Sequence, residues 1–108
     1  MTTIPTHKAF FGDAEHVFSL TPPMVLELEA VTGAGIGGLF RRLTQSDFRA
    51  KEITETIRLG LIGGGMTPES AARLVETYVP ATGLIESYSL ALAILETLMF
   101  GKSAGEGA

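Results

Sequence analysis

The chain has 108 residues, and 8 Lys and Arg against 12 Asp and Glu give it a net charge of −4 at pH 7. This length allows one domain, and 45% hydrophobic with only 19% charged residues excludes a disordered chain. Cysteine is absent, which excludes disulfides, thiolate nucleophiles and zinc sites with sulfur ligands. The acidic balance without clustered cations argues against a nucleic-acid partner.

Neither a targeting segment nor a membrane span is expected. The first twenty residues contain Lys8, Asp13 and Glu15 and lack the apolar stretch of a signal peptide. The most apolar stretch, residues 84–100, is interrupted by Glu86 and Glu96 and is too short between them for a bilayer. We therefore predict a core helix there and no membrane partner.

Residues 7–20 are predicted to form a β-hairpin, because aromatic and β-branched residues flank a turn signal. With Asp13 and Ala14 as the two-residue loop, Phe11 faces His16. The apolar side chains then divide between two faces, Ala9, Phe11, Phe18 and Leu20 on one and Phe10 and Val17 on the other. Two strands alone are marginal, so the hairpin must lean on helices or pair with another chain.

Two short helices are predicted next. Thr21 followed by proline indicates a helix start, and Gly33 is placed to end this helix, which spans about residues 22–32. In the second helix Arg41 and Arg42 are expected to face water. Its apolar face consists of Ile36, Leu39, Phe40 and Leu43.

Two longer helices with clear ends follow. Ser46-Asp47 is predicted to open the third, which carries Lys51 and Glu55 as an exposed ion pair and ends at Gly63-Gly64-Gly65. Thr67-Pro68 opens the fourth, which spans about residues 68–79.

The fifth helix, over about residues 83–100, has the widest apolar surface, which predicts a central place among the others. Gly101 closes it, and residues 102–108 are predicted to be a flexible tail. The predicted fold is mainly α, an N-terminal β-hairpin followed by a compact bundle of about five helices. Residues 1–101 are expected to form this single domain.

Residues 33–38, GAGIGG, match the dinucleotide-binding pattern G-x-G-x-x-G. That pattern should follow a buried strand, whereas the preceding segment carries Glu27 and Glu29 at helical positions. We therefore interpret the run as a turn between helices and predict no cofactor. Residues 60–65, GLIGGG, have no lysine to hold a phosphate and are interpreted as a flexible loop or a site of close helix packing.

No catalytic or metal-binding residues are predicted. His7 and His16 can approach each other near Asp13 and Glu15, but a two-stranded ribbon supplies no second shell for a metal. No serine has a histidine near it in sequence, and proximity in space stays open. The acidic residues are spread one or two per helix and are interpreted as a solubilising surface.

Four segments together resemble a known family. They are Leu28-Glu29-Ala30-Val31-Thr32-Gly33, Ile36, Gly60-Leu61-Ile62-Gly63-Gly64-Gly65 and the closing helix at 91–101. Over about residues 8–101 the chain resembles the gene transfer agent and phage tail family of small tail-assembly proteins. The resemblance implies a non-enzymatic protein of a prophage-like gene cluster, acting in the bacterial cytoplasm. Some descriptions of the family name an assembly chaperone that binds the tape-measure protein, and others a tail-tube component.

Two hypotheses follow. The first is a tail-assembly chaperone with tape-measure and tail-tube proteins as partners. The second is a structural tube subunit that self-associates into a homo-oligomer by strand pairing, and the small number of strand residues counts against it. The candidate partner-binding residues, each of which can also belong to the core, are Phe10, Val17, Ile36, Leu39 and Phe40.

Overall fold

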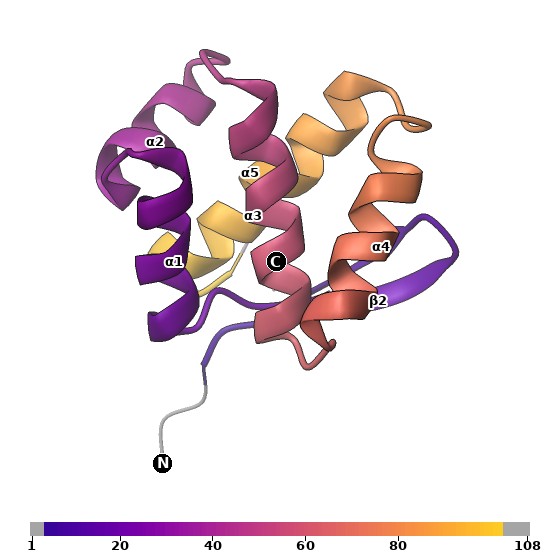
Figure 1. Cartoon of the computed structure of the whole chain (residues 1–108). Helices are drawn as coiled ribbons and strands as arrows, with labels where there is room; N and C mark the ends of the chain where they lie inside the picture. The colour runs from indigo at the N-terminus through magenta and orange to yellow at the C-terminus, as the bar shows by residue number, and fades with distance from the viewer. Residues whose placement is uncertain (1–3, 103–108) are drawn as a thin grey trace.

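A computed structural model describes residues 4–102 and confirms the predicted fold class (Figure 1). The elements in order are β1 (His7–Phe11), β2 (Ala14–Phe18), α1 (Pro22–Thr32), α2 (Ile36–Thr44), α3 (Ala50–Gly63), α4 (Pro68–Tyr78) and α5 (Leu84–Phe100). Beyond Lys102, the predicted tail lies outside the described residues. In the described part, no helix by itself is long and apolar enough to cross a bilayer. Only α1 and α2 taken together pass that test, and the chain bends by 74° between them.

Helix α3 occupies the centre of the fold, and the prediction of a central α5 is wrong. Helices α1, α4 and α5 and strand β2 all pack on α3, as Figure 1 shows for the helices. The α3 side chains Ile53, Ile57 and Leu61 are buried. Although α5 is more apolar, it has large apolar side chains near both of its ends that stay exposed, among them Ile85 and Phe100. Apolar surface on a helix therefore does not by itself identify the centre of a bundle.

The hairpin turns one residue earlier than predicted. Gly12 and Asp13 form the loop, so Phe11 lies opposite Ala14 and not opposite His16. Gly12 has a φ of 69°, as the first loop position of a type II′ turn requires. Only glycine adopts this conformation without strain, which explains why the loop begins at Gly12.

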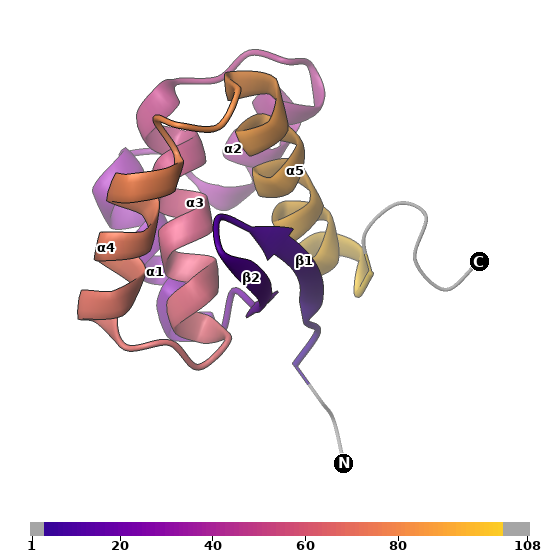
Figure 2. The ribbon, with the colours of Figure 1, turned by 90° about the vertical axis from the view of Figure 1, so that its right-hand side faces the viewer.

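The predicted faces of the hairpin are nevertheless confirmed. The pairing shifts by two residues, and a shift of two keeps every side chain on its face. Phe11 and Phe18 are buried in the core, whereas Phe10 and Val17 point away from it. In Figure 2 the hairpin lies beside α3 and α5, which agrees with the packing of β2 on α3 and of β1 on α5.

Strand β2 leaves the hairpin directly across the C-terminal end of α3. The backbone N–H of Ser19 donates to the carbonyl oxygen of Gly60 at 2.9 Å. A methyl group on Gly63 would overlap the carbonyl oxygen of Ser19, and one on Gly64 would overlap that of Val17. The glycines of residues 60–65 thus serve close packing, in which the backbone at the end of the hairpin lies directly on the backbone of α3.

An ion pair closes the corner between α2 and α3. Glu52 is only 1% exposed, and Arg42 donates to both of its carboxylate oxygens, at 3.0 Å between Nη1 and Oε1. The backbone N–H of Arg49 donates to the same carboxylate at 2.9 Å. The predictions that Arg42 faces water and that the acidic residues are all solvated are therefore wrong.

The same contacts set the protonation of Glu52. Burial by itself would raise the pKa of Glu52, but the hydrogen bonds from Arg42 and Arg49 and the charges of both guanidinium groups hold this pKa below its ordinary value. The Glu52 hydrogen bond in turn raises the pKa of Arg42, against the effect of burial.

Helix α3 begins at Ala50, later than the predicted start at Ser46-Asp47. Ser46 has a left-handed φ of 60°, which ends the preceding turn and prevents a helix from starting there. Farther along α3, the predicted ion pair between Lys51 and Glu55 does not form. Glu55 pairs with Arg58 instead, at 2.7 Å.

Candidate functional site

The outer face of the hairpin carries two apolar side chains toward solvent. Phe10 is 71% exposed and Val17 is 36% exposed. Phe10 lies opposite Glu15, and Val17 lies opposite Lys8, so one acidic and one basic residue accompany the apolar pair. Such an aromatic and aliphatic pair with a charged rim is typical of a protein-binding surface.

The inner face holds this hairpin against the helices. The Phe11 ring meets the Phe18 ring edge-on at 6.5 Å between centroids and the Tyr78 ring at 6.3 Å. Gly12 lies so close to Tyr78 that a methyl group there would overlap the ring. Because the inner face packs against the core, the strand that carries Phe10 on its outer face is held in place.

The two edges of the sheet differ. The sheet has two strands, and the β2 edge continues onto α3 through the hydrogen bond from Ser19 to Gly60. In this register the N–H and C=O groups of Lys8 and Phe10 point outward from β1. Within residues 4–102 no strand pairs with that edge, so the edge can accept an extended segment of another chain.

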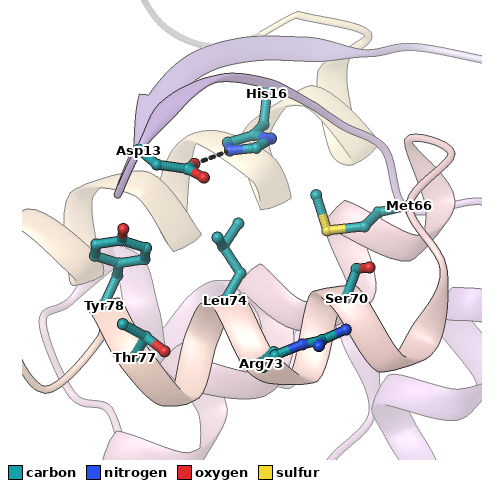
Figure 3. A pocket seen from close by; sticks show the side chains of 8 residues that line it. All are labelled: Asp13, His16, Met66, Ser70, Arg73, Leu74, Thr77 and Tyr78. Atoms are coloured by element: carbon teal, nitrogen blue, oxygen red, sulfur yellow. Dashed lines mark hydrogen bonds and ion pairs between the residues drawn. The ribbon is translucent and has the colours of Figure 1, made fainter.

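A cavity of about 380 Å³ lies between the hairpin and α4, and Figure 3 shows the residues around it. His16 Nε2 lies 2.9 Å from Asp13 Oδ1, and Ser70 stands across the cavity on α4. A serine and a hairpin histidine therefore line the same cavity, on opposite sides of it. Within the described chain, however, no hydrogen bond joins Ser70 to His16. The N–H of Ser70 is bound to Thr67 Oγ1 in the helix cap.

The candidate metal ligands do not assemble. His16 binds Asp13, and Glu15 lies on the opposite face of the hairpin from His16. In the part of the chain that the structure describes, no three His, Asp or Glu side chains are close enough to hold a metal ion.

The first glycine run does not form a phosphate site. Glu29 Oε2 accepts from the N–H of Ile36 at 2.8 Å, so a carboxylate of the chain itself occupies the start of α2. Gly33 ends α1 with a left-handed φ of 72°, as expected of a C-cap. Helix α1 lies directly before this run, and the sheet among the described residues is an antiparallel hairpin, so the parallel strand that the dinucleotide pattern needs is lacking there.

The second candidate surface, on α2, divides between core and surface. Leu39 is completely buried and belongs to the core, whereas Ile36 and Phe40 are half-buried. Phe40 meets the exposed Phe100 edge-on at 5.5 Å between ring centroids. Sequence reasoning missed Phe100, because its exposure depends on how the end of α5 packs in the folded chain.

These features define a small helical protein with an aromatic-bearing hairpin and, within residues 4–102, no cluster of metal-ligating side chains. The chain belongs to the family described as phage tail tube protein, GTA-gp10, which it matches over residues 5–101. The predicted resemblance is thereby confirmed, and the chain is a non-enzymatic tail-assembly protein. No curated protein and no solved structure matches the chain significantly.

Proposed function

We propose that the chain is a tail-assembly chaperone that binds the tape-measure protein in the bacterial cytoplasm through the outer face of its hairpin. The observation that carries this proposal is the 71% exposure of Phe10 on a strand whose other face is anchored in the core. Exposing a large aromatic side chain gains nothing for folding, and buried aromatics are frequent hot spots in protein interfaces. The membership in a tail-assembly family supports a tail protein as the partner.

Val17 and the free edge of β1 extend this surface. Val17 adds apolar area on the same face as Phe10, while the outward N–H and C=O groups of Lys8 and Phe10 offer main-chain hydrogen bonds. A surface with both contacts holds an apolar segment of a long partner and shields it from aggregation until the tube forms around it.

The test is capture of the tape-measure protein encoded in the same tail cluster, co-expressed with the tagged full chain. We expect the double variant F10S/V17S to lower the captured amount by about tenfold or more, because it removes the central apolar contacts. The matched control is L26S on α1, since Leu26 is 67% exposed and lies outside the hairpin. Undiminished capture by a folded F10S/V17S protein would refute the proposed surface.

The second candidate function is a structural subunit of the tail tube, and the description of the family together with the open edge of β1 favours it. Against it, β1 and β2 have five residues each, whereas ring-forming subunits usually close through larger sheets. Sedimentation of the purified chain distinguishes the two functions. A tube subunit assembles into rings or stacks as its concentration rises, and a chaperone does so only with its partner.

A further inference from the structure

A second cavity, of about 240 Å³, lies between the hairpin turn and the start of α5. It is separate from the cavity of Figure 3 and borders the proposed partner surface, because Phe10 forms part of its rim. The other residues that matter for its chemistry are Tyr78, Thr82, Glu86, Ser87 and Leu90.

Ser87 is one of the residues that line this cavity, and its hydroxyl group is buried and unsatisfied. Its side chain is 1% exposed, and its Oγ has no hydrogen-bond partner. Other buried hydroxyls on these helices bind the carbonyl one turn back, as Thr56 does with Glu52 at 2.7 Å and Thr97 with Ala93 at 2.8 Å. Buried polar groups are normally paired, so the Ser87 hydroxyl points to a ligand that completes it.

Glu86 gives the cavity its charge. It is the charged residue of the lining, and within residues 4–102 it has no hydrogen bond or ion pair. It lies in the first turn of α5. The walls around it are aromatic and aliphatic, from Phe10, Tyr78 and Leu90.

We propose that this cavity receives an arginine side chain of the protein that covers Phe10, an inference that rests on the proposed function. The apolar walls take the aliphatic stem and the flat face of the guanidinium group, which stacks well on aromatic rings. The Glu86 carboxylate pairs with the positive charge, and Ser87 Oγ accepts one of its N–H groups. The aromatic rings at the cavity favour arginine over lysine.

The cavity is tested apart from the partner by NMR titration of the ¹⁵N-labelled full chain with n-butylguanidinium. We expect saturable amide shifts at Thr82, Glu86 and Ser87, with weaker shifts for the neutral n-butylurea. The variant E86Q should weaken binding by about threefold or more, as for a partly exposed ion pair. The matched control E76Q removes an exposed carboxylate on α4 outside the cavity and should leave binding unchanged.

Ser87 provides a variant that separates binding from folding. S87A removes an unpaired hydroxyl, so it should leave thermal stability unchanged or raised while it weakens n-butylguanidinium binding. Absence of saturable shifts in the wild type, or equal affinities for E86Q and the wild type, would overturn the proposal. Loss of capture in F10S/V17S without binding of the cation would leave the proposed function standing and refute the arginine site alone.

Discussion

The two glycine runs look alike in sequence and have different surroundings in the fold. In residues 33–38, a methyl group on Gly33 or Gly37 would meet no atom within 4 Å. In residues 60–65, methyl groups on Gly63 and Gly64 would overlap the backbone of the hairpin exit. One run is an open link between two helices, and the other is the surface on which β2 is seated.

The difference shows two ways to hold an element in place. At residues 60–65 the glycines lack side chains, which lets the backbone of α3 contact the backbone of the hairpin directly. The helix that follows the first run is held by carboxylates, Glu29 at its start and Glu52 at its end, where Arg42 binds. The backbone packing at residues 60–65 depends on shape, whereas the carboxylate contacts of α2 depend on charge. Substitutions and changes of pH can therefore distinguish the two.

The largest effect is expected for Gly63→Ala, which tests the packed run. Alanine favours a helix over glycine by about 1 kcal/mol, but the added methyl group must displace the carbonyl of Ser19. We expect the free energy of unfolding to fall by about 3 kcal/mol. Urea denaturation followed by circular dichroism measures it. A gain in stability would mean that β2 is not seated on α3 in solution.

An intermediate effect is expected for Glu52→Gln, which tests the charged anchor. Loss of the buried, charge-assisted hydrogen bonds should lower the free energy of unfolding by about 2 kcal/mol at pH 7. The pKa of Glu52 is lower in the folded than in the unfolded chain. Its stabilising contribution is therefore complete above the ordinary carboxyl pKa and is lost as the pH falls through the folded value.

Thermal unfolding between neutral and acidic pH checks this dependence. Wild type should lose more stability on acidification than the Glu52→Gln variant. The exposed Glu76→Gln serves as the control and should keep the wild-type profile. Parallel profiles for wild type and Glu52→Gln would show that the ion pair with Arg42 does not contribute to folding.

The smallest effect, and the opposite sign, is expected for Gly37→Ala in the open run. The residue lies in the first turn of α2 and has free space for a methyl group. We expect stabilisation by about 0.5 kcal/mol, because alanine reduces the entropy of the unfolded chain. Chemical denaturation alongside Gly63→Ala measures it. A loss as large as that of Gly63→Ala would erase the contrast between the two runs.

The accuracy of the sequence predictions follows the range of the interactions behind them. A threonine followed by proline, which predicts the start of a helix, and a glycine that predicts its end are local signals. Helices begin at two such threonines, Thr21 and Thr67, and end at two such glycines, Gly33 and Gly101. The predicted position of the hairpin loop was wrong by one residue, because several turn-forming residues follow Gly12 and each could begin the loop.

The candidate site was predicted unevenly for the same reason. Alternation along two strands sufficed to place Phe10 on the outer face, whatever the register. The burial of Leu39 and the exposure of Phe100 depend on which helices pack together, and alternation says nothing about that. The cavity with Ser87 and Glu86 needs the hairpin turn and α5 side by side, residues more than seventy positions apart.

By itself the sequence determined the fold class, the faces of the hairpin and the family, because periodicity, caps and short motifs are written in neighbouring residues. The tertiary structure alone decided which helix is central, which of the two glycine runs is packed, and that Glu52 is a buried partner of Arg42. Those outcomes depend on contacts between distant segments, whose geometry exists only once the chain has folded.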